Sequence, residues 1–167
     1  REAGVESDPE ETGKTFEENA RIKAVAGMKA SGMPCIADDS GLEVLALDCR
    51  PGVMSARYSG SHGDDAANNE KLLAELADKP DRSARYVCVI CMAFPDGREL
   101  EARGECYGEI LKEKRGNGGF GYDPLFYFPQ FGKTFAEISA EEKNEVSHRN
   151  AALKAFEKLW EKEINDK

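Results

Sequence analysis

The chain has 167 residues, 40% of them hydrophobic, and a formal net charge of −9 at pH 7. This length and apolar content suit one domain with a substantial core, so we expect residues 1–167 to form a single domain. The negative charge disfavours nucleic-acid binding, and the chain has no apolar run long enough to span a bilayer.

The first half of the chain predicts two helices with extended segments between them. Thr15-Phe-Glu-Glu18 is a capping-box pattern that begins an amphipathic helix ending near Gly32. A short apolar strand, Pro34–Ala37, is expected next, and Leu42–Leu47 predicts a further extended piece. Asp64 is expected to cap a second helix that runs to Asp78.

The second half predicts a β-hairpin. Two extended runs, Arg85–Phe94 and Arg98–Ile110, are joined by Pro95-Asp-Gly97, which is a strong turn signal. Even-numbered residues of the second run, from Leu100 to Ile110, are small or apolar and should share one face.

The five cysteines are odd in number and irregularly spaced, which disfavours a disulfide framework and predicts a reducing, cytoplasmic location. The acidic start of the chain, residues 1–11, is typical of neither a signal nor a transit peptide. Cys88 and Cys91 form C-x-x-C, but residues three apart on a strand face opposite sides, so we do not expect them to share zinc.

Residues 116–124, GNGGFGYDP, contain the pattern G-x-G-x-x-G. A dinucleotide-binding fingerprint needs a buried strand before it and a helix after it, whereas charged residues precede this stretch and Tyr122-Asp-Pro124 disfavours immediate helix entry. We interpret the glycines as a loop that approaches a ligand closely, with a plain surface loop as the alternative.

After this loop, Leu125–Phe128 is extended, and a last helix is expected from about Ser147. The expected apolar side of that helix carries Leu153, Phe156, Leu159, Trp160 and Ile164. Helices interleaved with both parallel-looking and hairpin strands predict an α/β fold with a mixed sheet.

Acidic residues at two places are candidates for chemistry. Asp38 and Asp39 follow the strand Pro34–Ala37 and should point to opposite faces, so one would bond turn amides and the other would project from the strand's carboxyl end. A structural turn role for both is the alternative. Glu10 and Glu11 could supply an oxygen ligand for magnesium or remain solvated charges.

Basic residues gather at the entrance to the last helix. Lys143, His148 and Arg149 lie where a helix N-terminus is already positive, so their placement predicts a compensating anion or acceptor. Alternatively, His148 is a packed core histidine and Arg149 pairs with a local glutamate.

Six motifs follow one another along the chain in the same order as in a known family. The chain resembles the inosine triphosphate pyrophosphatase family, the non-canonical purine NTP pyrophosphatases, from about Glu10 to the final helix. The motifs are TFEENARIKA, ADDSGLEV, PGVMSARYSG, GGFGYDPLF, KTFAEISAEEKN and SHR. The resemblance implies an elongated central sheet with flanking helices, two lobes around a nucleotide cleft, and a homodimer.

The resemblance also implies an activity. It is the Mg²⁺-dependent hydrolysis of ITP, dITP or XTP between the α- and β-phosphates to the monophosphate and pyrophosphate, which cleanses the nucleotide pool.

The resemblance further implies residue roles. Asp39 matches the general base, and Glu11 with Asp39 matches the metal-associated acids, with Glu10 as the alternative to Glu11. Residues that match substrate contacts are Ser40, Phe120, Gly121, Tyr122, Asp123, Lys143, His148 and Arg149. Among these, Phe120 would stack on the base.

The chain departs from the family pattern in two places. Asp48-Cys49 stands where the family commonly has two glycines, and the family's N-terminal strand, phosphate-binding loop and helix are not found before Arg1. A catalytically silent nucleotide-binding protein is therefore one alternative. Another is a phosphatase that uses Asp39 as a nucleophile and releases inorganic phosphate.

Overall fold

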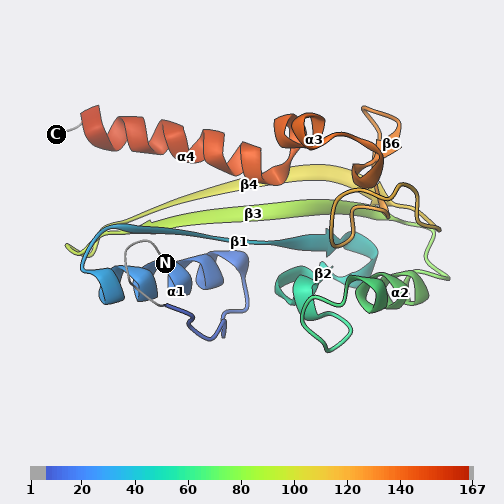
Figure 1. Cartoon of the computed structure of the whole chain (residues 1–167), viewed down its shortest axis with the longest axis horizontal. Coiled ribbons are helices and arrows are strands. Elements are labelled where there is room, and N and C mark those ends of the chain that lie inside the picture. Colours follow the sequence, from blue (N-terminus) through green and yellow to red (C-terminus); the bar gives the residue numbers. More distant parts are fainter. Residues whose placement is uncertain (1–6, 166–167) are drawn as a thin grey trace.

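The computed structural model describes residues 7–165, which form an α/β fold around one sheet. Figure 1 shows helices on both faces of that sheet. The elements are α1 (Phe16–Ser31), β1 (Cys35–Val44), η1 (Leu45–Leu47), β2 (Arg50–Pro51), η2 (Gly52–Arg57), α2 (Asp65–Glu75), β3 (Ser83–Ala93), β4 (Glu99–Ile110), β5 (Phe126–Phe128), β6 (Lys133–Thr134), η3 (Phe135–Glu137), α3 (Ala140–Val146) and α4 (His148–Asn165).

The six strands lie in the order β2-β1-β3-β4-β5-β6. The long strands β1, β3 and β4 run the length of the molecule, with α1 and α2 on one face and α3 and α4 on the other (Figure 1). The predicted elongated sheet with flanking helices is confirmed. All pairs between these described strands are antiparallel, so the parallel pairing expected of a mixed sheet is not found within residues 7–165.

The predicted helix starts and the hairpin are confirmed. Thr15 caps α1 by accepting a hydrogen bond from the Glu18 amide at 3.1 Å, and Gly32, with φ of 69°, is the C-cap that follows Ser31. Asp64 caps α2, which ends at Glu75 rather than Asp78. The last helix begins at His148, one residue after the expected position.

The structure corrects the expectation for residues 34–47. Most of the two expected extended pieces forms the single strand β1, whereas Leu45–Leu47 forms the 3-10 helix η1 instead of an extended segment. Asp38 and Asp39 lie in the middle of β1, opposite Ile90 and Val89 of β3. Ladder bonds to β3 satisfy the backbone, so the Asp-Asp-Ser-Gly stretch forms no turn. Gly41 is needed here because an added Cβ would lie 2.6 Å from the Gly52 carbonyl oxygen.

Two small cores fill the two faces of the sheet at one end. Val87, Val89 and Cys91 of β3 pack against α1, while Cys88 and Ile90 pack against α4. The expectation that Cys88 and Cys91 face opposite sides is therefore confirmed.

The expected apolar side of α4 is partly wrong. Phe156 is buried and Trp160 packs against the core, but Leu153, Leu159 and Ile164 are exposed. The helix lies so close to β4 that a Cβ on Gly104 would be 2.1 Å from the Ala152 amide nitrogen. Small Ala152 therefore faces the sheet where a leucine would not fit.

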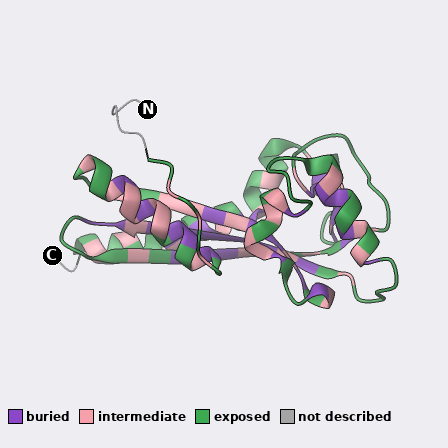
Figure 2. Ribbon diagram, turned by 90° about the horizontal axis from the view of Figure 1, so that it is seen from below, coloured by how far each residue is buried: buried purple, intermediate pink, exposed green. Residues whose placement is uncertain are grey.

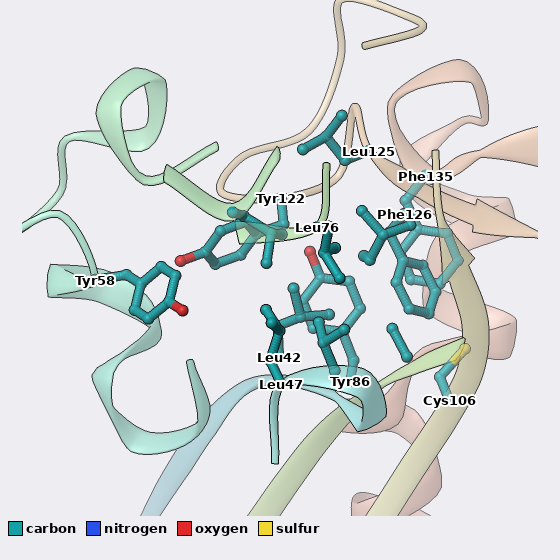
Figure 3. Packing of buried hydrophobic residues seen from close by; sticks show 14 of the residues in the cluster. Leu42, Leu47, Tyr58, Leu76, Tyr86, Cys106, Tyr122, Leu125, Phe126 and Phe135 are labelled. Atoms are coloured by element: carbon teal, nitrogen blue, oxygen red, sulfur yellow. The ribbon is translucent and has the colours of Figure 1, made fainter. Parts of the chain in front are cut away.

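A larger core lies at the other end of the sheet, where α2, β5 and η3 meet the same strands (Figures 2 and 3). Its centre is Tyr86, whose ring lies 4.6 Å from Phe126 and 5.9 Å from Phe135 between centroids. This aromatic cluster supports the cavity described below. No helix within residues 7–165 has the length and hydropathy needed to cross a membrane.

Candidate active site

One cavity of about 170 Å³ brings together all the residues expected to contact substrate. They come from β1, from the loop between β4 and β5, from α3 and from the start of α4. The predicted residues in its wall are Ser40, Phe120, Gly121, Tyr122, Asp123, Lys143, His148 and Arg149. A second cavity of about 260 Å³ shares Phe120, Lys143, His148 and Arg149 with it.

The glycine loop forms one wall of the cavity and leads into β5 rather than into a helix. Gly116, Gly119 and Gly121 have φ of 81°, 70° and 60°, a region that favours glycine. At Gly119 an added Cβ would also lie 2.1 Å from an Asp123 carboxylate oxygen. The loop is therefore shaped by close approach to Asp123 and is no Rossmann turn.

Asp123 anchors the aromatic face of the cavity. Its buried carboxylate accepts hydrogen bonds from the Tyr86 hydroxyl at 3.2 Å, from the Phe120 amide at 3.0 Å and from Lys143 Nζ. Lys143 Nζ also lies 4.3 Å from the centroid of the Phe120 ring. Phe120 is 68% exposed, so its ring offers an open surface on which a flat base can stack.

Whereas Phe120 is exposed, Tyr122 is buried. Its ring is buried in the core shown in Figure 3, and its hydroxyl donates a hydrogen bond to the Ser55 carbonyl oxygen at 2.8 Å. Tyr122 therefore supports the wall of the cavity and leaves the stacking surface to Phe120.

His148 is 8% exposed and stacks on Tyr86, with ring centroids 4.9 Å apart. Burial lowers the pKa of His148 to about 4, and repulsion from Arg149 and Lys143 adds to this effect. Its Nδ1 atom is buried and has no hydrogen-bond partner among residues 7–165. A neutral imidazole at this position has one nitrogen that donates and one that accepts.

Arg149 pairs with Asp38 rather than with a local glutamate. The two side chains meet at 2.8 Å, and the Ser40 hydroxyl donates to the same carboxylate oxygen at 3.2 Å. Burial would raise the pKa of Asp38, but the bonds from Arg149 and Ser40 more than offset it and lower the pKa. Asp38 therefore orients Arg149, and the expected bonds to turn amides are absent from β1.

Asp39 lies on the other face of β1 and meets residues of α1. One carboxylate oxygen is 2.8 Å from Lys23 Nζ, and the other accepts a hydrogen bond from Asn19 Nδ2 at 3.3 Å. Asp38 and Asp39 thus have separate partners, as the strand geometry predicts. Asn19 and Lys23 were missed in the sequence, although their spacing of four on a helix places them on one side.

Glu11, rather than Glu10, joins this group, because its carboxylate lies 2.9 Å from Lys23 Nζ. Burial raises the pKa of Asp39, Lys23 and Asn19 oppose the rise, Glu11 adds to it, and the net direction is upward. Burial lowers the pKa of Lys23, but its two carboxylate partners reverse the direction. The group therefore holds a charged lysine between two acids.

These two carboxylates are the side chains of this group that could hold a metal ion. Within the described part of the chain, no three His, Cys, Asp or Glu side chains gather in a way that would hold a metal. Mg²⁺ is often held by one or two carboxylates together with substrate phosphates and water. Glu11 and Asp39 both lie within 2.9 Å of Lys23 Nζ, so the two carboxylates are close enough to share one ion that arrives with a triphosphate.

Comparisons with known proteins give a family and several relatives. Residues 1–159 match the Ham1 family. A dITP/XTP pyrophosphatase of Desulfotalea psychrophila is 62% identical over 143 residues, which are 86% of this chain and 64% of the relative. One of Staphylococcus aureus (strain N315) is 50% identical over 158 residues, which are 95% of this chain and 81% of the relative.

Solved structures give the same result for the fold. The Staphylococcus aureus Ham1 protein has a TM-score of 0.89 at 50% identity, covering 93% of this chain and 81% of that chain. A HAM1 protein from Coxiella burnetii has a TM-score of 0.90 at 45% identity, and the match covers 96% of this chain and 83% of that chain. The chain spans 64% of the Desulfotalea psychrophila relative and 62% of one from Syntrophobacter fumaroxidans.

Proposed function

Because the chain belongs to the Ham1 family, we propose that it hydrolyses non-canonical purine nucleoside triphosphates such as dITP, ITP and XTP. The products would be the nucleoside monophosphate and pyrophosphate, and the reaction would remove deaminated purines from the nucleotide pool. The relatives named dITP/XTP pyrophosphatase support this proposal.

The observation that carries the proposal is the donor set around the cavity. Arg149 only donates hydrogen bonds, and His148 is neutral near pH 7 because its pKa is lowered to about 4. A 6-keto purine presents an acceptor at the position where adenine carries an amino donor. A donor from Arg149 can therefore bind the keto oxygen but finds no acceptor in the adenine amino group, which favours the keto base.

The acidic group supplies the chemistry of hydrolysis. Asp39, whose pKa is raised, would act as general base on the attacking water, and Lys23 would neutralise charge on the pyrophosphate leaving group. Glu11 and Asp39 would hold a magnesium ion, which when bound neutralises further charge on the phosphates.

We also propose that the protein works as a cytoplasmic homodimer. All five cysteines are free thiols, which suits a reducing compartment. The dimer rests on the family resemblance and is tested by sedimentation equilibrium, where a monomer mass at micromolar concentration would reject it.

Product analysis tests the proposed reaction. Purified protein with Mg²⁺ should release pyrophosphate from dITP and XTP much faster than from dATP, and chelation of the metal should stop the release. Inorganic phosphate as the first product would instead favour a phosphatase with Asp39 as nucleophile. Binding of dITP without any turnover would identify a silent nucleotide-binding protein.

A further inference from the structure

We propose that Asp65 and Asn69 of α2 are positioning residues that hold the Phe120 ring in place for the purine base. This inference rests on the proposed function for its substrate. It concerns a helix that supplies no residue to the expected chemistry, and it explains why α2 lies against the glycine loop.

Both backbone polar groups of Gly121 are bonded to α2. The Gly121 amide donates a hydrogen bond to Asp65 Oδ2 at 2.7 Å, and the Gly121 carbonyl oxygen accepts one from Asn69 Nδ2 at 2.8 Å. Asp65 and Asn69 are four residues apart and therefore lie on the same side of the helix. Two bonds from one helix face thus hold a single loop residue.

The chemistry of Asn69 shows that its orientation is determined by this contact. Its Nδ2 also donates to the Asp65 carbonyl oxygen at 2.6 Å, so two carbonyl acceptors face the same end of the amide. Only the nitrogen end has donors for them. The residue is 2% exposed, and its Oδ1 is left without a partner among residues 7–165, a cost that is offset by keeping both donors in use.

The position of Phe120 depends on these bonds because its ring is not packed in a core. The Phe120 amide is held by Asp123, and the next residue is held by α2. Gly121 has φ of 60° and open space where a Cβ would lie, so the glycine serves backbone conformation rather than close packing. Releasing Gly121 from α2 would let the ring swing away from Lys143 and from a stacked base.

The test uses Asp65, which is exposed and can be replaced without opening a cavity. Asp65→Ala removes the acceptor, whereas Asp65→Asn loses the charge but keeps an oxygen that accepts from the Gly121 amide. Both changes lose the same favourable interaction with the helix N-terminus, so their difference isolates the hydrogen bond. Glu70→Ala, exposed on the same helix, is the matched control.

We expect Asp65→Ala to raise the KM for ITP on the order of tenfold with little change in kcat, since base stacking is made in both ground and transition states. Asp65→Asn and Glu70→Ala should resemble the original protein. Inhibition by inorganic triphosphate, which has no base, should be equal in all four proteins. An unchanged KM in Asp65→Ala, or a fall in kcat alone, would overturn the proposal.

Two measurements keep this test separate from the proposed function. Calorimetric titration with inosine monophosphate, which is not turned over, should show weaker binding to Asp65→Ala than to Asp65→Asn, Glu70→Ala and the original protein. Hydrogen exchange of residues 116–123 should be faster in Asp65→Ala and normal in Asp65→Asn. If the original protein hydrolyses no ITP, the proposed function fails, while equal exchange in all variants would refute the role of α2.

Discussion

At the scale of single residues, Asp39 carries the first prediction. Asp39→Asn keeps the shape of the side chain and one acceptor for Lys23, but it would remove the proposed general base and weaken the proposed metal site. We expect kcat for dITP to fall by on the order of 10² or more with the fold intact. Steady-state kinetics and circular dichroism measure both, and a variant with full activity would reject Asp39 as the base.

His148 carries a prediction about pH. Its folded-state pKa of about 4 lies below the unfolded value near 6.5, so the unfolded chain binds the proton more readily between these values. The contribution of His148 to the free energy of unfolding should be fully present above about pH 6.5. It should fall by roughly 3 kcal/mol as the pH decreases to 4.

Urea unfolding from pH 7.5 to 4 measures this effect. His148→Gln has no proton to gain and is the control for the carboxylates that titrate in the same range. The difference between the two proteins should change only between about pH 6.5 and 4. Parallel pH profiles would show that His148 is not held neutral by burial.

Arg149 and Asp38 carry a prediction about base choice. Arg149→Ala should reduce ITP turnover far more than residual ATP turnover, because it removes a donor that only the keto base satisfies. Asp38→Asn should give a smaller loss of the same kind. It removes the charge of the carboxylate that lies 2.8 Å from Arg149, and so weakens the ion pair that orients the guanidinium. Equal losses on ITP and ATP would mean that Arg149 binds phosphates or supports structure.

Sequence patterns located most of the cavity wall but few of the contacts within it. Glycines around Phe120 and basic residues at the entrance to the last helix are local signals that can be seen in the sequence. The bond between Arg149 and Asp38 spans 111 residues, and the bond between Asp39 and Lys23 joins a strand to a helix. Such partners depend on how α1 and α4 pack on opposite faces of the sheet, which no local pattern encodes.

At the scale of elements, the turn after β1 carries a prediction about stability. Asp48 and Cys49 have φ of 54° and 62°, a region that favours glycine. An L-residue in this region costs about 1–2 kcal/mol, and glycine recovers most of this despite its entropy cost of about 0.5–1 kcal/mol. Cys49 is exposed, so its side chain contributes little packing.

Cys49→Gly should therefore stabilise the protein by about 0.5–1 kcal/mol, measured as the urea midpoint at unchanged slope. Cys49→Ala removes the thiol but keeps the Cβ, so it should leave the midpoint within about 0.5 kcal/mol of the original. If both variants shift equally, the thiol rather than the backbone is responsible.

Local element signals were reliable where capping and turn residues set them, as for Thr15, Asp64 and Pro95-Asp-Gly97. They failed at β1, where Asp38 to Gly41 has the composition of a turn but lies within a strand. Pairing with β3 along all ten residues of β1 outweighs this local preference. The apolar side of α4 was misjudged for a related reason, because close packing against Gly104 selects alanine over leucine at the contact.

At the scale of the whole molecule, β3 connects the two ends of the protein. Its residue Tyr86 lies in the core below the base cavity, whereas Val87 to Ala93 fill the two smaller cores under α1 and α4. The two ends therefore share strands rather than meeting across a linker, and we expect residues 1–167 to unfold as one domain.

Trp160, the single tryptophan, makes this expectation measurable. Its ring stacks on Phe94 at 6.3 Å, just beyond the end of β3 that is remote from the base cavity, and Figure 1 shows α4 running from α3 to this end. About eight residues of extended chain separate Phe94 from Tyr86, roughly 25 Å. Inosine monophosphate at about 100 times its Kd should stabilise the folded protein by about 2.7 kcal/mol.

The Tm reported by Trp160 fluorescence should then rise by roughly 5–10 °C, together with the Tm from far-ultraviolet circular dichroism, because ligand energy gained at one end stabilises the whole cooperative unit. Adenosine monophosphate should give a smaller shift, and Arg149→Ala should remove the difference between the two nucleotides. A shift seen by circular dichroism but not by Trp160 would show that the two ends unfold separately and that the sheet does not couple them.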